Sequence, residues 1–189
     1  LEALFDGQLV FRTREDWQTP IGDFKAGSLL SADLDALVQT GRIDRIDTLF
    51  EPTPSQSIES VARTRSSLLV NLNVDVTSEL HCFERTDGAW AGRRADMPEN
   101  GSISLSFAGS ETDLALVTYE GFLAPDSLMA LDTANDRWET LQSLPARFDA
   151  SGLSVRQEFA ISSDGVRVPY FVIGASDLRL DGNNPAYLY

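Results

Sequence analysis

The sequence predicts an all-β fold, and three observations support this prediction. Short runs rich in Val, Leu, Phe and Tyr alternate with clusters of Gly, Pro, Asn and Asp, as strands alternate with turns. The strand pattern repeats at intervals of about 50 residues. Only one helical turn is expected, over residues 33–38, where Leu34, Leu37 and Val38 share a face. A segment this short cannot support a helical architecture.

The repeat is anchored on a Leu that is followed four residues later by an acidic residue. This pair recurs as Leu29–Asp33, Leu80–Glu84 and Leu128–Asp132, about 50 residues apart. Apolar runs precede each anchor, and a further candidate strand follows it. Four antiparallel strands with this period are typical of a β-propeller blade. The sequence therefore predicts a partial propeller of about three four-stranded antiparallel blades.

The expected strands follow one another within each unit. In the first unit they cover residues 9–14, 29–33 and 46–51, and its innermost strand is shortened by the start of the chain. In the second unit they cover residues 58–63, 68–74, 80–84 and 90–97. In the third unit they cover residues 103–108, 114–122, 128–132 and 138–144. Residues 15–26 lengthen a loop of the first unit. Asp87-Gly88 predicts a hairpin turn in the second, because glycine tolerates the positive φ that such turns require.

The pattern changes after Pro145. Residues 155–161 and 166–173 predict a long hairpin that pairs with no blade, and residues 177–185 predict a loop before a final apolar strand, residues 186–189. We place a domain boundary near residues 148–153. The chain starts with Leu1 rather than Met and stops in an apolar segment, which we interpret as the two ends of a fragment.

Composition excludes several classes of function. The chain has 29 acidic and 15 basic residues and a net charge of −14, which disfavours nucleic acid and anionic membranes as partners. No stretch approaches the roughly 20 consecutive apolar residues of a membrane span. A single cysteine, Cys82, and a single histidine, His81, leave little for disulfide, metal or histidine-based catalytic chemistry.

The candidate chemical residues all have structural interpretations that we prefer. Strand alternation places His81 with Phe83 on one side and Leu80 with Cys82 on the other. His81 has no nucleophile or second ligand nearby in the sequence, and Cys82 lies among apolar neighbours, so we interpret them as a strand residue and a buried inert thiol. We therefore assign no catalytic, cofactor-binding or metal-binding residue, and we expect no cofactor.

The remaining candidates are acids and tryptophans. Residues 177–184 lack the acid spacing of a calcium loop and predict a solvated turn. Asp33 and Asp35 predict a solvated edge rather than a carboxylate pair. All three tryptophans, Trp17, Trp90 and Trp138, are candidates for a platform on which a ligand stacks. Trp90 and Trp138 recur at the start of a fourth strand, where a large ring packs between neighbouring sheets, so we prefer a core role. The acidic surface is either a solvated rim or a tunnel lining that favours basic peptides.

Three segments near the end of the chain carry a resemblance to a known family. SLPARFDASGL (143–153), SSDGVRVPYFVI (162–173) and LDGNNPAYLY (180–189) resemble the junction of propeller and peptidase domain in the prolyl oligopeptidase family of serine peptidases. YEGFLAPDSL (119–128) and LFEPTPSQSI (49–58) are similar to last-blade and inter-blade segments of that family. The likeness is to the prolyl oligopeptidase branch more than to the oligopeptidase B or dipeptidyl peptidase branches.

The resemblance implies an enzyme in which a seven-bladed propeller caps an α/β-hydrolase domain. Residues 1–148 are then the C-terminal blades, and residues 149–189 are the hairpin and first strand of a truncated peptidase domain. The family's oxyanion segment and catalytic triad follow the position matching Tyr189, so Tyr187 and Tyr189 are implied to be structural. The sequence itself agrees that the triad is absent, because it contains no G-x-S-x-G pentad, the turn that holds the nucleophilic serine of an α/β-hydrolase.

Two hypotheses about function follow. The first is the propeller portion of a serine endopeptidase that cleaves short peptides after proline, in which the propeller gates access and this chain alone is not an enzyme. The alternative is a free-standing propeller-like binding module without activity. The apolar end, residues 186–189, argues against the alternative, because an exposed apolar strand edge invites aggregation.

Partners and compartment follow from the first hypothesis. The implied partners are an oligopeptide substrate and the parent enzyme's own α/β-hydrolase domain. Self-association of this chain is also expected, because a three-blade arc leaves the outer faces of its end blades uncovered. The compartment stays open: the cytoplasm is favoured, and the periplasm is compatible because any signal peptide would lie upstream of Leu1.

Overall fold

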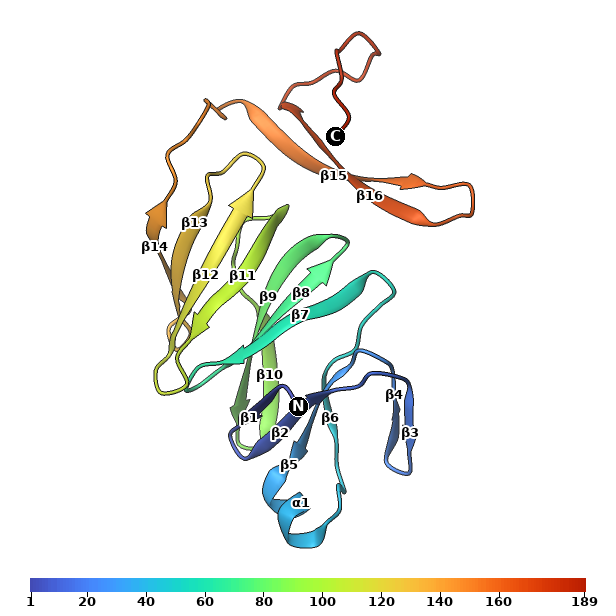
Figure 1. The fold of residues 1–189 in the computed structure, drawn as a ribbon, viewed down its shortest axis with the longest axis vertical. Helices are drawn as coiled ribbons and strands as arrows, with labels where there is room; N and C mark the ends of the chain where they lie inside the picture. Colours follow the sequence, from blue (N-terminus) through green and yellow to red (C-terminus); the bar gives the residue numbers. More distant parts are fainter.

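The computed structural model describes all residues from Leu1 to Tyr189 and contains three four-stranded antiparallel sheets (Figure 1). The first consists of β1 (Ala3–Phe5), β2 (Gln8–Arg12), β5 (Leu29–Asp33) and β6 (Asp47–Phe50). The second consists of β7 (Gln56–Arg63), β8 (Leu68–Val74), β9 (Thr77–Thr86) and β10 (Ala89–Arg94). The third consists of β11 (Gly101–Ala108), β12 (Leu114–Gly121), β13 (Ser127–Asp132) and β14 (Arg137–Ser143). The prediction of three blades is confirmed.

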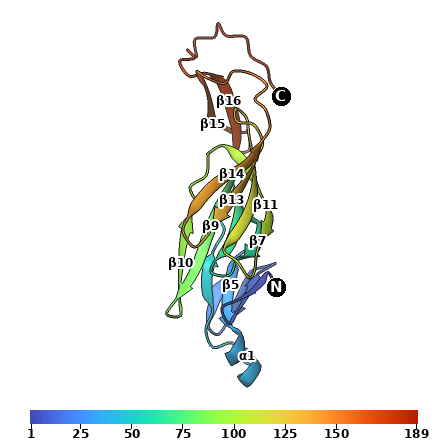
Figure 2. The ribbon, with the colours of Figure 1, turned by 90° about the vertical axis from the view of Figure 1, so that its left-hand side faces the viewer.

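The three blades form an open arc. Strand β7 lies beside both β1 and β11, so the first strands of successive blades are neighbours along the inner side of the arc. The blades fan out from there, and the molecule is long and narrow when seen from the side (Figure 2). None of its helical structure has the length and apolar character needed to cross a lipid bilayer.

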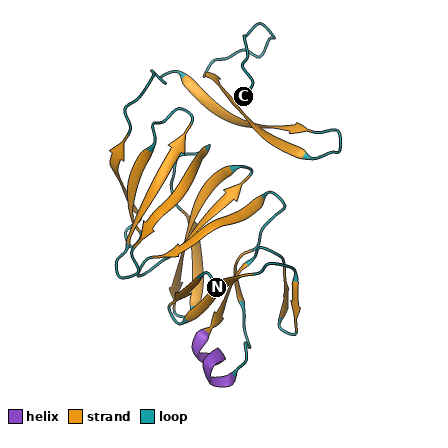
Figure 3. Cartoon of the chain, in the orientation of Figure 1, coloured by secondary structure: helices purple, strands orange, loops and turns teal.

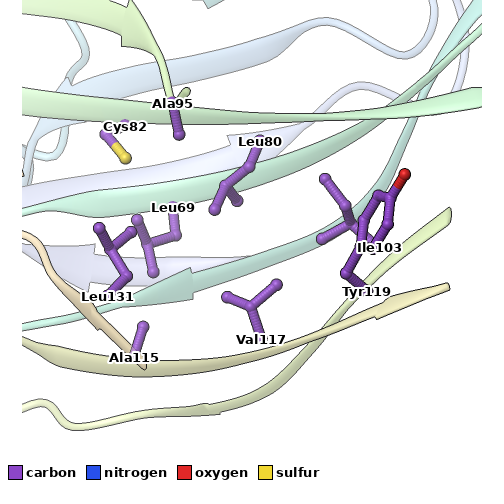
Figure 4. Close-up of a cluster of buried hydrophobic side chains, with 9 residues drawn as sticks. All are labelled: Leu69, Leu80, Cys82, Ala95, Ile103, Ala115, Val117, Tyr119 and Leu131. Carbon is purple, nitrogen blue, oxygen red and sulfur yellow. The ribbon is translucent and has the colours of Figure 1, made fainter. Parts of the chain in front are cut away.

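The second blade is covered on both faces, and this explains why β8 carries buried apolar residues on both of its faces. Leu68, Val70 and Leu72 pack with Phe5 and Val10 of the first blade. Leu69, which points the other way, belongs to the cluster between the second and third blades (Figure 4). Side chains alternate along a strand, so a strand between two sheets carries apolar residues on both faces. The buried Asn71 is an exception, and its Nδ2 donates a hydrogen bond to the carbonyl of Ile103 at 2.8 Å.

The cluster in Figure 4 is the larger of the two inter-blade cores. It consists of nine buried residues, which are Leu69, Leu80, Cys82, Ala95, Ile103, Ala115, Val117, Tyr119 and Leu131. Since each comes from the second or third blade or their connection, this cluster fixes those two sheets against one another by burial of apolar surface.

The predicted turn of the second blade is confirmed. Thr86 of β9 pairs with Ala89 of β10, which leaves Asp87 and Gly88 as a two-residue loop. Their φ angles are +51° and +79°. Positive φ at both central positions is the requirement of a type I′ hairpin turn, which Asp-Gly satisfies at low cost.

The expected helical turn is present as α1 (Leu34–Thr40), coloured purple in Figure 3. Asp33 caps it, since its Oδ1 accepts a hydrogen bond from the backbone N–H of Ala36 at 2.7 Å. The helix ends at Gly41, which has a φ of +68°. This small helix lies at one extremity of the arc (Figure 1).

The long loop of the first blade contains a hairpin that sequence analysis missed. Strands β3 (Trp17–Thr19) and β4 (Gly22–Phe24) pair within it. The Trp17 ring lies 6.2 Å from Phe11 of β2 and 5.8 Å from Phe24, between ring centroids. These aromatic contacts stabilise strands of three residues that show no alternation of their own.

After the third blade, β15 (Leu153–Ile161) and β16 (Arg167–Ala175) form a separate two-stranded sheet. The prediction of a hairpin that pairs with no blade is confirmed. The prediction of a strand over residues 186–189 is wrong, because these residues have no regular secondary structure. Tyr187, Leu188 and Tyr189 are almost fully exposed. Apolar composition alone makes no strand without a neighbouring edge to supply hydrogen bonds.

Candidate functional site

His81 lies on β9 with a carboxylate as its polar partner. Its Nε2 is 3.0 Å from Glu79 Oε2, and its ring stacks on Phe83 with centroids 6.5 Å apart. Leu80 and Cys82 are fully buried on the opposite side of the strand, as alternation predicts. A catalytic base needs a hydrogen bond to a nucleophile or a substrate position. The partners of His81 supply neither a serine nor a thiol.

Cys82 is a free thiol inside the core between the second and third blades (Figure 4). Burial raises the pKa of this thiol to about 11, chiefly because the thiolate would lose its hydration there. The thiol form therefore dominates at neutral pH, and this cysteine is a small core residue rather than a nucleophile.

The acidic candidates are engaged locally or exposed. Asp33 caps α1, and Asp35 lies in the first turn of that helix. Asp181 Oδ1 accepts a hydrogen bond from the N–H of Asn183 at 3.0 Å, within the loop interpreted as a solvated turn. The structure contains no group of three or more His, Cys, Asp or Glu residues placed to hold a metal ion.

Two of the three tryptophans pack between blades. The Trp90 ring stacks on Phe5 of the first blade with centroids 5.7 Å apart, and its Nε1–H donates to Ser31 Oγ at 2.8 Å. Trp138 packs against the core between the second and third blades. Trp17 instead lies in the surface hairpin β3–β4 and is partly exposed.

The β15–β16 hairpin contacts the blades at one end of the arc, seen at the top of Figure 1. Phe171 of β16 lies 4.9 Å from Phe122, which follows β12, between ring centroids. Gln157 of β15 donates a hydrogen bond to the backbone carbonyl of Asp75, in the turn between β8 and β9. These contacts define what we call the hairpin end of the arc.

Two cavities open at the hairpin end. One, of about 320 Å³, lies between the hairpin and the last two blades, and its lining includes Asn100, Glu120, Phe122 and Phe171. The other, of about 580 Å³, lies between the first two blades. Gln56 lines this second cavity and pairs with Val74, next to Asp75, which places it at the same end.

Charged groups line the cavity between the first two blades. Arg12 Nη1 donates to the carbonyl of Ile58 at 2.7 Å, and Lys25 pairs with Glu51. The hydrogen bond from Lys25 to Glu51 raises the pKa of that exposed lysine. The hydroxyl side chains that line these two cavities form no hydrogen bond to a carboxylate, an imidazole or an amine, so the structure shows no activated nucleophile in either one.

The blades match a family model described as "Prolyl oligopeptidase, N-terminal beta-propeller domain" over residues 17–143. The chain belongs to the prolyl oligopeptidase family. The match runs from β3 to the end of β14, so it includes most of the three-blade arc. The resemblance stated from the sequence is confirmed by this match, and residues 17–143 are propeller residues of the family.

Two bacterial relatives match along the chain. "Uncharacterized peptidase y4nA" of Sinorhizobium fredii is 37% identical over 187 residues, which are 98% of this chain and 26% of the relative. "Uncharacterized peptidase RP174" of Rickettsia prowazekii is 24% identical over 190 residues, which are 100% of this chain and 26% of that relative. The chain thus spans about a quarter of the length of these curated relatives.

A solved structure shares the fold. The post-proline cleaving enzyme from Rickettsia typhi superposes with a TM-score of 0.76 at 23% identity, over 97% of this chain and 27% of its own. Because this likeness covers almost the whole chain, it extends past the blades to the β15–β16 hairpin. At this identity it shows the arrangement of strands, and the chemistry has to be argued separately.

Proposed function

We propose that this chain is the propeller portion of a prolyl oligopeptidase that cleaves short peptides after proline. Residues 1–148 are its C-terminal blades, and residues 149–189 begin the α/β-hydrolase domain. The observation that carries the proposal is the β15–β16 hairpin, a separate sheet held to one end of the arc by Phe122–Phe171 and Gln157–Asp75. Phe171 of this hairpin lines the cavity of about 320 Å³, so a domain that starts with the hairpin begins beside that cavity.

The role of the blades is exclusion. A folded protein cannot enter a chamber closed by blades, whereas an extended peptide can reach a serine and adopt the geometry that acyl transfer requires. The nucleophile, base and oxyanion donors come from the rest of the enzyme. In this chain the single imidazole, His81, is hydrogen-bonded to Glu79 on strand β9, in the middle of the second blade.

The test compares this chain with the longer protein that contains it. A chromogenic glycyl-prolyl substrate and a serine-reactive phosphonate probe are offered to both. We expect hydrolysis and stoichiometric labelling with the longer protein and neither with residues 1–189. Labelling of a serine within residues 1–189 that disappears in His81→Ala would contradict the proposal.

The outer face of the third blade supports a second proposal, self-association of the isolated chain. Phe107 and Leu114 are 50% and 41% exposed there, near the adjoining ends of β11 and β12. Apolar faces of this kind are covered by a neighbouring blade within a repeat array. We expect the isolated chain to sediment as a concentration-dependent oligomer or to bind the dye ANS. A monomer that binds no dye would overturn this proposal.

A further inference from the structure

A small cavity lies between the first and second blades at the end of the arc away from the β15–β16 hairpin. Arg85 and Gly88 line it near the end of β9, whereas Asp75, which contacts the hairpin, precedes the start of that strand. Its volume is about 170 Å³. At roughly 30 Å³ per water this holds about five or six waters, which suits a chemical group of a few atoms rather than a folded segment.

Two polar groups at this cavity lack partners in the chain. Gln8 of β2 is only 4% exposed, lines the cavity and forms no side-chain hydrogen bond within the chain. Arg85 Nε is buried without a hydrogen-bond partner, although Arg85 Nη1 donates to Asp6 Oδ2 at 3.1 Å. A buried polar atom without a partner, such as Arg85 Nε, is rare in folded proteins and calls for an explanation. The Gln8 carboxamide is accessible from the cavity, so it is free to bond to a group that enters there.

The charges around the cavity show which kind of ligand fits. Asp33 accepts a hydrogen bond from Ala36, and Asp47 accepts one from Arg45, so these two carboxylates are engaged. Arg42 and Asp44 line the same cavity, and neither forms an ion pair, so Arg42 is the cation of the lining that is free to bind an anion and Asp44 opposes it. A guanidinium and a primary amide both donate N–H groups, and a carboxylate, with its two oxygens, can accept from both.

We propose that this cavity binds a carboxylate group, held by the guanidinium of Arg42 and the carboxamide of Gln8. The proposal goes beyond the peptidase role and does not depend on it, because the cavity lies away from the hairpin end. Either a small free carboxylate or the C-terminus of a peptide carries this group. The two sources differ in the atoms attached to the carboxylate, and the experiment separates them.

The test follows the side-chain amide signals of Gln8 by NMR in ¹⁵N-labelled residues 1–189. Acetate, acetyl-Gly-Gly and acetyl-Gly-Gly-amide are titrated at constant ionic strength, with sodium chloride as the control. We expect saturable shifts with a Kd on the order of 1 mM for a carboxylate and none for the amide. Binding of acetate identifies a small carboxylate as sufficient, and binding of acetyl-Gly-Gly alone identifies a peptide terminus. The absence of saturable shifts, or equal shifts with chloride, would overturn the proposal.

Charge variants test the assigned residues. Arg42→Gln should weaken binding about tenfold, because it removes a charge-assisted hydrogen bond. Asp44→Asn should strengthen binding, because Asp44 also lines the cavity and repels an anion. Arg137→Gln, an exposed arginine on β14, is the matched control and should change nothing. An equal loss in Arg137→Gln and Arg42→Gln would show only general attraction to the surface and would contradict the site.

Gln8→Met separates binding from a structural role. The variant keeps the length of the side chain and removes a carboxamide that has no partner in the free chain. Because the variant lacks the Gln8 side-chain amide, binding is followed on the backbone amide signals around the cavity. Gln8→Met should abolish the acetate-dependent shifts of these signals and leave the urea midpoint of unfolding unchanged or higher. A lower midpoint with binding preserved would show that Gln8 supports the fold and takes no part in a site.

Discussion

Thr64 and Thr133 are 69 residues apart in the sequence, yet their hydroxyl oxygens lie 2.9 Å from one another in the structure. Thr64 follows the first strand of the second blade, and Thr133 follows the third strand of the third blade. Both residues are almost completely buried. This hydroxyl pair joins two blades at the end of the arc opposite the hairpin, beside the Arg65–Asp113 ion pair.

Thr64→Val should lower the free energy of unfolding by about 1–3 kcal/mol, because it removes the hydroxyl partner of the buried Thr133 and the acceptor of the Ser67 N–H. The Thr133 hydroxyl keeps only its bond to the carbonyl of Asp113, at 3.2 Å. Urea denaturation followed by tryptophan fluorescence measures the change. Thr118→Val is the control, since Thr118 pairs with Ser106 within one blade at an exposed position. Its effect should stay within about 0.5 kcal/mol. Equal effects of the two substitutions would show that the inter-blade bond has no special weight.

Asp113 should make stability depend on acid. Hydrogen bonds from Ser66, followed by the contact with Arg65, hold the pKa of this carboxyl below its ordinary value of 3.8. A carboxyl whose pKa is lower in the folded state contributes stability above its unfolded pKa and loses that contribution as the pH falls through the folded value. The urea concentration at the midpoint of unfolding should therefore decrease once the pH falls below about 4.

The Asp113 contribution is isolated by comparing two carboxyl substitutions. Asp113→Asn should reduce stability at pH 7. In a plot of the urea midpoint of unfolding against pH, it should also make the decrease at acidic pH (the acid limb) less steep. Glu139→Gln, an exposed position on β14, serves as the control and should leave the limb unchanged. An acid limb that is identical in Asp113→Asn and in the unsubstituted chain would disprove a coupling between this carboxyl and folding.

Cys82 should resist thiol reagents while the chain is folded. Its pKa of about 11 keeps the thiolate scarce at pH 8, and the core between the blades blocks access. Reaction with dithionitrobenzoate should be slow in buffer and complete within seconds to minutes in 6 M urea, where the pKa returns to its ordinary range, about 8.5. Fast labelling in buffer would mean that the second and third blades separate readily in solution.

The blades were predictable from the sequence because their signals are local. Strand β8 carries apolar residues on both faces, and Asp87-Gly88 marks a turn by its conformational preference alone. The β3–β4 hairpin was missed because strands of three residues show no period, and its stability comes from the contact of Trp17 with Phe11 and Phe24. The terminal strand, residues 186–189, was wrongly predicted because its apolar composition does not reveal whether a pairing edge is available.

The sites were less predictable, since they depend on contacts between blades. The interpretation of His81 and Cys82 needed only strand alternation. The cavity at Gln8 joins a residue of β2, a loop residue, Arg42, and the end of β9 at Arg85, and no spacing in the sequence relates the three. Gln8 is a polar residue at a core-facing position of β2, two residues before the buried Val10, and this is the signal that the sequence offers.

Gly101 and Gly121 flank the ring of Tyr119 so closely that neither position has room for a side chain. A Cβ atom at Gly101 would lie 2.3 Å from Tyr119 Cε2, and one at Gly121 would lie 2.8 Å from its hydroxyl oxygen. The two glycines are also register partners, Gly101 as the first residue of β11 and Gly121 as the last residue of β12. The ring, 5% exposed, fills the end of the core between the second and third blades as a result.

Gly101→Ala should therefore destabilise the chain by about 1–3 kcal/mol, the usual cost of forcing extra atoms into a packed core. Gly174→Ala is the control, because the nearest atom to its added Cβ is the flexible Leu178 Cδ2 at 3.3 Å. Adding Tyr119→Leu to each background completes a double-mutant cycle, since leucine removes the ring that the new methyl meets. The Gly101→Ala cost should largely vanish in the leucine background. If it persists there, the glycine is required by the backbone of β11 itself, and the contact with Tyr119 does not set the packing at this end of the blades.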